Sequence, residues 1–228
     1  MGRLITDLVA EADDLQLVGL VTENGREQPA GFFHPQLPLS GQRELATIHR
    51  HRGVVIDFSL APALAGLLEQ CEKAEAALVV GTTGFDTAQR EALADYAARH
   101  PVVVAANFSI GIPTLQMVLK LLARTLPDGF VAEQIETHHV HKLDRPSGTA
   151  RWPATAWEGE RSGSTVPIHS LRLGEIVGEH TWVISDAEET LQVTHRAQSR
   201  RAFLRGVLPA VRFVTGRQPG LYGLADVL

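Results

Sequence analysis

The side chains best suited to chemistry are concentrated between residues 137 and 149. This stretch contains three histidines, a lysine and an aspartate: His138, His139, His141, Lys142 and Asp144. An imidazole can donate or accept a proton near neutral pH, and a neighbouring lysine can bind a carboxylate or donate a proton to it. The run Ser147-Gly148-Thr149 follows, and its backbone N–H groups and hydroxyls can bind an anion if a helix begins there.

Three interpretations of this stretch are open from residue types alone. On a regular strand alternate side chains share a face, so His139 and His141 would point to one side. His138 and Lys142 would then point to the other. A metal site built from His139, His141 and Asp144 fits this spacing, and a purely structural polar turn is a second interpretation. We favour the third, an acid–base and anion-binding site, because so many suitable groups lie within a few residues.

A second candidate site is the run Gly81-Thr82-Thr83-Gly84, which follows the apolar run 77–80 and precedes a helix that Asp86 is expected to cap. A glycine turn between a strand and a helix, at the carboxyl edge of a parallel sheet, is where such folds bind ligands. Glycines also occur in such turns for backbone reasons alone. Residues 105–108 end the next apolar run and could line the same crevice, although Asn107 could equally cap the following helix.

The elements expected in the first half alternate between helix and strand. Leu4, Leu8 and Val9 mark an amphipathic helix that starts almost at the first residue, and residues 25–41 form a loop with three prolines. Strands are expected at 15–22, 54–58, 77–80 and 101–106, and helices at 63–74 and after residue 86. Strands separated by helices predict an α/β domain with a parallel, doubly wound, Rossmann-like sheet.

The second half has a different pattern. A long apolar-faced helix is expected at 112–126, and a last helix at 202–214 returns to the first unit. Strands at 130–141, 168–177, 181–185 and 190–197 have no regular helices between them. That pattern predicts an α+β unit with an antiparallel or mixed sheet. We therefore expect two domains, one of residues 1–108 with 200–228 and one of residues 109–199.

Composition excludes several classes of protein. The chain has 228 residues, and 21 Lys plus Arg against 26 Asp plus Glu give a net charge of −5, which argues against a general nucleic-acid-binding protein. The single cysteine, Cys71, can form neither an internal disulfide framework nor a cysteine-rich zinc site. No apolar run reaches the roughly 20 residues of a membrane span, and no signal peptide is recognisable, so we expect a cytoplasmic protein.

Several stretches together resemble the dihydrodipicolinate reductase (4-hydroxy-tetrahydrodipicolinate reductase) family of lysine and diaminopimelate biosynthesis. They are residues 80–85, 105–109, 138–142, 147–150, 174–180 and 220–228, in order along nearly the whole chain. The resemblance implies reduction of a cyclic dicarboxylate, 4-hydroxy-tetrahydrodipicolinate, to tetrahydrodipicolinate with NADPH or NADH. It also implies a dinucleotide-binding domain, followed by a substrate domain that assembles homotetramers.

The resemblance also implies roles for individual residues. His138 matches the family's proton donor, and Lys142 matches its partner in catalysis. The cradle for the substrate carboxylates is matched by His139, Ser147, Gly148 and Thr149. The cofactor crevice is matched by Met1, Gly2, Glu23, Gly81, Thr82, Thr83, Ala105, Ala106, Asn107 and Phe108.

The sequence departs from the family pattern in two places. The family begins with a strand and a G-x-x-G-x-x-G turn that binds the pyrophosphate, whereas this chain starts at Met1 with Gly2 as the apparent third glycine. A truncated chain that lacks the first strand, a divergent but working enzyme and a non-catalytic relative all fit this difference, and we favour truncation because the catalytic cluster is intact. Glu23 is left as the candidate for the ribose and Arg26 for a 2′-phosphate. After Ala150, a shortened segment with Pro153 is expected to replace the family's helix. A non-catalytic, dicarboxylate-binding relative is the alternative function.

Overall fold

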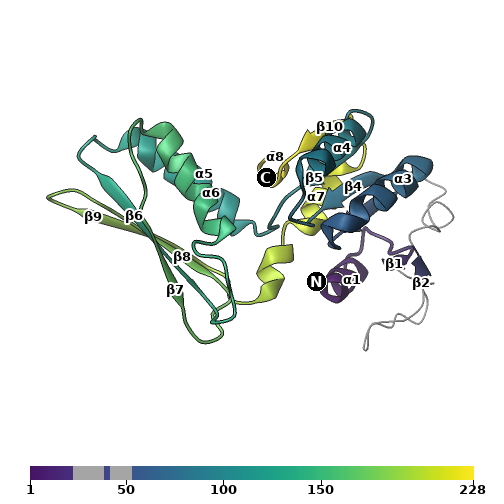
Figure 1. Cartoon of the computed structure of the whole chain (residues 1–228), viewed down its shortest axis with the longest axis horizontal. Coiled ribbons are helices and arrows are strands. Elements are labelled where there is room, and N and C mark those ends of the chain that lie inside the picture. The colour runs from purple at the N-terminus through teal and green to yellow at the C-terminus, as the bar shows by residue number, and fades with distance from the viewer. Residues whose placement is uncertain (23–38, 42–52) are drawn as a thin grey trace. The chain divides into compact units, whose positions relative to one another are not determined.

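The computed structural model describes residues 1–22, 39–41 and 53–228 (Figure 1). The chain divides into two compact units. Unit 1 comprises Met1–Phe108 and Leu204–Leu228, and unit 2 comprises Ser109–Phe203. Each unit is built around a four-stranded sheet, with two apolar cores in unit 1 and one in unit 2.

Unit 1 is built on a four-stranded parallel sheet with strand order β10-β5-β4-β3. Its strands are β3 (Val54–Asp57), β4 (Ala77–Val80), β5 (Pro101–Val104) and β10 (Gly220–Tyr222). Alternate side chains enter two different cores: Leu78 and Val80 pack with one, and Val79 with the other. Apolar strands of this kind suit a sheet covered on both faces, and the expected Rossmann-like parallel sheet is confirmed.

Helices cover both faces of this sheet. The first core is closed by α3 (Leu64–Ala74), which follows the short 3-10 turn η2 (Ala61–Ala63), and by α4 (Thr87–Ala97). The second is closed by α1 (Gly2–Ala10), α7 (Val207–Val214) and α8 (Leu224–Val227). The amphipathic helix expected at the first residues is confirmed as α1, which buries Ile5 and Val9.

The strand expected at 15–22 is largely wrong. Only Leu20–Thr22 forms a strand, β1, and it pairs in parallel with β2 (Leu39–Gly41) in a separate two-stranded sheet. Leu15 and Leu17 instead pack as irregular chain against the second core. Their apolar character is therefore satisfied by burial without a strand partner. The expected loop at 25–41 includes β2, and its residues 25–38 lie outside the described part of the chain.

Unit 2 carries a mixed sheet with strand order β7-β6-β8-β9. Its strands are β6 (Val131–His138), β7 (Ile168–Arg172), β8 (Glu179–Ser185) and β9 (Thr190–Arg196). β6 is parallel to β7, whereas the other two pairs are antiparallel. Helices α5 (Gly111–Thr125) and α6 (Gly148–Glu160) pack on one face around a core that includes Trp157 and Trp182. The expected α+β unit with a mixed sheet is confirmed.

Helix α6 corrects the expectation that no helix follows Ala150. Pro153 lies inside it, where proline removes one backbone hydrogen bond to the preceding turn. Two features offset that loss. The Ser147 hydroxyl accepts a hydrogen bond from the Ala150 N–H at 3.1 Å and caps the helix. One helix face also buries Ala154 and Trp157.

The last helix is also shorter than expected, because residues 200–204 form the 3-10 segment η3 (Arg200–Leu204) before α7. Within the described residues, no helix has both the length and the apolar character needed to cross a bilayer.

Candidate active site

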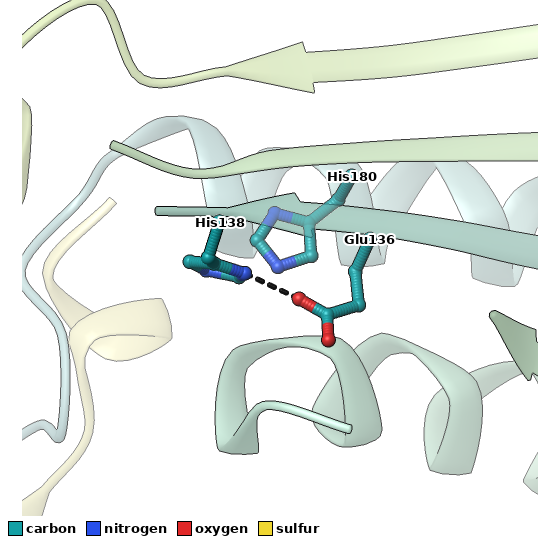
Figure 2. Close-up of side chains that lie close together, drawn as sticks. All are labelled: Glu136, His138 and His180. Atoms are coloured by element: carbon teal, nitrogen blue, oxygen red, sulfur yellow. Dashed lines mark hydrogen bonds and ion pairs between the residues drawn. The ribbon is translucent and has the colours of Figure 1, made fainter. Parts of the chain in front are cut away.

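The inner face of the unit 2 sheet carries a row of buried polar side chains. On β6, the alternation of side chains places Glu136 and His138 on this face, 0% and 6% exposed. His180 on β8 lies directly across from Glu136 and is 3% exposed, and His195 on β9 lies across from His180. Figure 2 shows the His180 ring beside the other two side chains. A buried polar row is costly unless its groups are paired, so its pairings decide what it can do.

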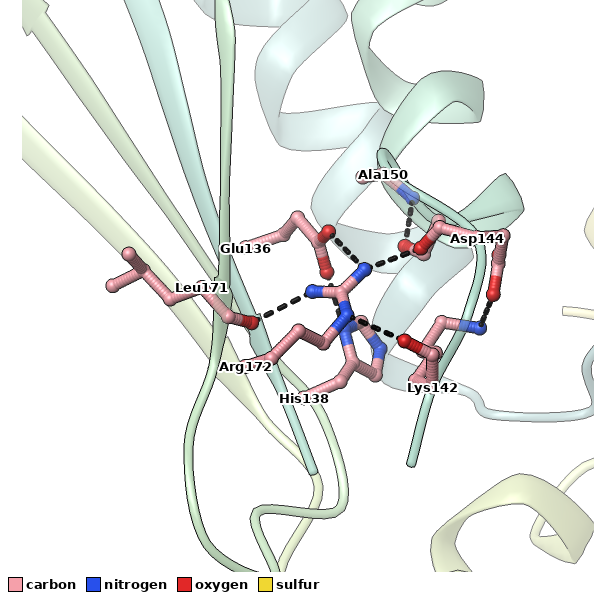
Figure 3. Close-up of polar contacts among 8 residues, drawn as sticks. Glu136, His138, Lys142, Asp144, Ala150, Leu171 and Arg172 are labelled. Atoms are coloured by element: carbon pink, nitrogen blue, oxygen red, sulfur yellow. Dashed lines mark hydrogen bonds and ion pairs between the residues drawn. The ribbon is translucent and has the colours of Figure 1, made fainter. Parts of the chain in front are cut away.

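Glu136 is the centre of these pairings. Its Oε2 forms a hydrogen bond with Nδ1 of His138, and its Oε1 lies 2.8 Å from Nη2 of Arg172. The Arg172 side chain is 3% exposed. Figure 3 shows its guanidinium between the Glu136 carboxylate and the turn after β6. One carboxylate therefore contacts both an imidazole and a guanidinium, away from solvent.

Burial and charge act in opposite directions on Glu136. Burial by itself raises the pKa of this carboxyl, but hydrogen bonds from Arg172 and Ser170 and the nearby His138 bring it below its usual range. Burial lowers the pKa of His138, and Glu136 counteracts part of that shift. Burial also lowers the pKa of His180 to about 3, with His138 and His195 adding to the effect. Glu136 is therefore ionised and His180 neutral at neutral pH.

The turn after β6 presents Lys142. Its Nζ lies 2.7 Å from Oδ1 of Asp144, and the Lys142 side chain is 25% exposed. The hydrogen bond from Lys142 lowers the pKa of the Asp144 carboxyl. Arg172 fixes the path of this turn: its Nε donates to the Lys142 carbonyl at 3.1 Å, and its Nη2 donates to the Asp144 carbonyl. Lys142 is thus a cationic group beside the buried row.

The start of α6 meets the condition set for anion binding by residues 147–149. The helix begins at Gly148, with Ser147 as its N-cap. Gly148 is exposed and Thr149 half-buried, whereas the Ser147 hydroxyl is buried and already serves as the cap. Backbone N–H groups at a helix N-terminus attract negative charge.

The remaining histidines of the cluster do not alternate as expected. β6 ends at His138, and the backbone then turns, with the Lys142 N–H bonding to the His139 carbonyl at 3.2 Å. His139 is half-buried and its ring centroid lies 6.0 Å from that of His141. His141 is exposed, with its Nε2 3.7 Å from Oε1 of Glu175. The expected placement of His139 and His141 on one strand face is wrong, because the strand stops before these residues.

The described residues fit a metal ion poorly at this site. Glu136, His138 and His180 each place a ligand atom within 4.8 Å of the others. However, the Glu136 oxygens are already engaged by His138 and Arg172, and the guanidinium would repel a cation. Asp144, of the alternative set with His139 and His141, is paired with Lys142.

The glycine turn of unit 1 follows β4, next to the end of β3. The Thr82 hydroxyl donates to Oδ2 of buried Asp57 at 2.7 Å, and the Gly81 N–H donates to the Asp57 carbonyl at 2.7 Å. A side chain at Gly81 would collide with the Phe58 ring, which is 2.3 Å from the position of a Cβ. Thr83 and Gly84 are exposed. Close packing thus explains Gly81, while the exposed half of the turn is available to a ligand.

The second cofactor candidate, 105–108, follows β5, whose end lies beside that of β4. Ala105 packs against the second core, Ala106 is exposed and Phe108 is fully buried. Asn107 does not cap the next helix, because the N-cap of α5 is Ile110. Both candidate runs therefore lie at the carboxyl edge of the same parallel sheet.

The other cofactor candidates are distributed differently. Met1 and Gly2 are exposed at the N-terminal end of α1, in unit 1. Glu23 and Arg26, the candidates for the ribose and a 2′-phosphate, lie outside the described residues.

Comparison with known proteins assigns the family. The model for the N-terminus of dihydrodipicolinate reductase matches residues 1–108, and the model for its C-terminus matches residues 111–228. The chain belongs to the dihydrodipicolinate reductase family. Two relatives named 4-hydroxy-tetrahydrodipicolinate reductase align with all of it: that of Thiobacillus denitrificans at 40% identity and that of Alkalilimnicola ehrlichii at 36%, each over 94% of the relative.

Solved structures support the family's fold. The chain is similar to dipicolinate-bound dihydrodipicolinate reductase from Paenisporosarcina sp. TG-14, with a TM-score of 0.83 over 100% of this chain and 95% of that one. Sequence identity is 23%, so this likeness concerns the fold. A more distant likeness, with a TM-score of 0.57 and 11% identity, is to diaminopimelate dehydrogenase of C. glutamicum, over 98% of this chain and 89% of that one.

Sequence reasoning missed Glu136, Arg172 and His180 in this member of the family. Glu136 had a detectable signal, because it lies two residues before His138 and shares its face on a strand. Arg172 and His180 come from β7 and β8, and only the strand register brings them to β6. His180 lies within the 174–180 stretch that carries the family resemblance, but the sequence alone indicates no role for it.

Proposed function

We propose that this chain reduces 4-hydroxy-tetrahydrodipicolinate to tetrahydrodipicolinate with NADPH or NADH, as a step of lysine and diaminopimelate biosynthesis. The observation that carries the proposal is the buried His138–Glu136 pair beside Lys142, in a chain of this family. Replacement of a hydroxyl by hydrogen consumes one hydride and one proton and releases water. The chain must therefore deliver a proton as well as bind the two reactants.

His138 is the proposed proton donor and Lys142 its partner. Burial lowers the pKa of His138 in the free chain, and the two carboxylates of a bound substrate oppose that shift, because nearby negative charge favours the imidazolium. Lys142 supplies a positive charge for one carboxylate. A general acid placed in this way typically contributes about 10²–10⁴-fold in rate.

The substrate carboxylates are proposed to bind at the start of α6. The helix provides backbone N–H groups at Gly148 and Thr149 and the positive end of its dipole. Ser147 keeps that end of the helix in place by capping it. His139, half-buried beside the turn, is the further proposed contact.

Residues 1–108 with 200–228, which include all of unit 1, are the proposed dinucleotide-binding part, and residues 109–199, within unit 2, are the proposed substrate-binding and oligomerisation part. A bound reduced nicotinamide supplies the hydride. The exposed residues Thr83, Gly84 and Ala106 leave the carboxyl edge of the sheet open to such a group, which supports this assignment. Gly81, Thr82, Ala105, Asn107 and Phe108 shape that edge, and Met1 and Gly2 lie at a helix N-terminus suited to phosphate.

We further propose a cytoplasmic homotetramer, on the family resemblance. Size-exclusion chromatography with light scattering measures the assembly directly. Calorimetric titration with NADPH and then NADH establishes which cofactor binds more tightly.

The decisive test replaces His138 with Gln or Ala and follows oxidation of the reduced cofactor with the cyclic substrate. We expect kcat to fall about 10²–10⁴-fold, while the urea midpoint stays near that of the unaltered chain. His141→Gln is the matched control, because His141 is exposed and lies three residues beyond the end of β6, in the turn. Full activity of both His138 variants, or dicarboxylate binding without any cofactor oxidation, would contradict the proposal.

A further inference from the structure

The ionisation of the Glu136 carboxylate determines which ring nitrogen of His138 carries hydrogen. Both Glu136 oxygens are engaged, one by Nδ1 of His138 and one by Nη2 of Arg172 at 2.8 Å. An ionised carboxylate can only accept hydrogen bonds. Nδ1 of His138 must therefore be the protonated nitrogen of the neutral ring, and Nε2 is left with the lone pair.

Arg172 links this pair to the turn that carries Lys142. Its guanidinium contacts Glu136 on one side, and on the other it donates to the backbone carbonyls of Lys142 and Asp144. It also donates to its own neighbour, the Leu171 carbonyl, at 2.6 Å. The planar guanidinium holds several acceptors in fixed directions. One buried side chain thus sets the positions of His138 and Lys142 relative to each other (Figure 3).

The surroundings of the His138 ring are compatible with proton exchange at Nε2. The charged groups that act on the pKa of His138 are Glu136 on its own strand, Lys142 in the turn and Arg172 on β7, and His180 on β8 faces its ring. His180 approaches edge-on, with ring centroids 5.3 Å apart. Both His180 ring nitrogens lack a hydrogen-bond partner among the described residues. Because His180 is neutral, it adds no positive charge beside the imidazolium that proton exchange requires.

We propose that Glu136 and Arg172 are positioning residues that fix the tautomer and orientation of His138, so that Nε2 is the atom that exchanges the proton. Glu136 orients the ring through Nδ1, and Arg172 orients Glu136 and the Lys142 turn together. Neither residue needs to touch the substrate. This inference rests on the proposed role of His138 as proton donor, but its central claim, the tautomer, belongs to the free chain.

The first measurement is therefore independent of turnover. Nitrogen-15 NMR of the histidine side chains reports which ring nitrogen carries hydrogen, and the His138 signals are assigned by their loss in His138→Gln. We expect the Nδ1–H form in the unaltered chain. In Glu136→Gln, whose amide can donate as well as accept, we expect the Nε2–H form to become populated. An Nε2–H ring in the unaltered chain would overturn the inference, whether or not the chain is a reductase.

The second measurement is kinetic. Glu136→Gln should lower kcat by as much as about 10⁴-fold, by analogy with a carboxylate that orients a catalytic histidine, with KM changed less than about threefold. Removing the negative charge also disfavours the imidazolium, so the decline of kcat/KM with rising pH should move to lower pH. Glu136→Asp, which keeps the charge, should restore part of kcat. A Gln variant with unchanged kcat and pH profile would refute the positioning role.

The same strand offers a matched control. Glu133 is an exposed carboxylate on the opposite face of β6, and its Oε2 lies 2.8 Å from Nε2 of His169. Glu133→Gln also replaces a carboxylate by an amide in a glutamate–histidine pair, but this pair is exposed to solvent. We expect kcat within twofold of the unaltered chain and an unchanged His138 tautomer. An equal loss in both variants would show a general effect of strand charge and contradict the specific role of Glu136.

Discussion

At the scale of single residues, the space around the His138 ring matters as well as its partners. Gly178 lies just before β8, and a Cβ added there would be 3.2 Å from Nε2 and 3.4 Å from Cδ2 of His138. The φ of Gly178 is outside the left-handed region, so backbone freedom is not the reason for glycine. The absence of a side chain keeps room beside the nitrogen proposed to exchange the proton.

Gly178→Ala should therefore move the imidazole by a few tenths of an ångström and reduce kcat. We expect a loss of about tenfold, since misplacement by ~1 Å can cost about 10²-fold, with the urea midpoint little changed. The control is Gly129→Ala, because a Cβ at Gly129 meets no atom within 4 Å. Steady-state kinetics of both variants is the measurement, and an unaffected Gly178→Ala would show that the ring tolerates the added methyl.

At the scale of elements, the cap of α6 connects stability to substrate binding. Ser147 is 1% exposed and its hydroxyl satisfies the Ala150 N–H. Ser147→Ala should cost about 1 kcal/mol of unfolding free energy and raise KM for the dicarboxylate severalfold, because the helix N-terminus loses its anchor. Urea unfolding and steady-state kinetics measure the two effects.

Asp86→Ala is the matched control for this cap. Asp86 caps α4 in unit 1 through a capping box with Gln89. Its loss should cost a similar amount of stability in that unit and leave KM for the dicarboxylate unchanged. If KM rose equally in both variants, the effect would come from general destabilisation, and the proposed role of the α6 N-terminus would be wrong.

Elements also show where sequence reasoning succeeded and where it failed. The buried β4 strand and the capping box at Asp86 were predicted because local patterns determine them. Helix α6 was missed because Pro153 is a residue type that usually ends a helix. The packing of Trp157 in the core of unit 2 outweighs this local effect, and that tertiary contact cannot be deduced from the local sequence. His138 and Lys142 could be chosen from one short stretch. Arg172 could not, since its role depends on pairing with β6.

At the scale of the whole molecule, the buried histidines make the fold sensitive to acid. The pKa of His180 falls from its ordinary 6.5 to about 3, chiefly by burial. Between these values the unfolded chain binds a proton that the folded chain does not. Stability therefore decreases as pH falls from about 6.5 towards 3, by at most about 1.4 kcal/mol per pH unit for this group. Burial lowers the pKa of His138 and His195 in the same direction.

His180→Phe removes this titration while keeping an aromatic ring in the core. We expect the unfolding free energy to depend less steeply on pH between 6 and 4, as measured by urea unfolding at several pH values. His169→Gln, at an exposed position, should leave the slope unchanged. A slope identical to that of the unaltered chain in His180→Phe would mean that His180 is not a source of the acid sensitivity.

The contacts of Arg172 with the turn have a consequence for how the turn can evolve. They go to the backbone carbonyls of Lys142 and Asp144, so these contacts themselves do not depend on which side chains the turn carries. Leu143, between these two residues, is 92% exposed. Natural drift or a designed library can therefore vary the side chain at position 143 while the backbone contacts that hold the turn beside His138 stay intact.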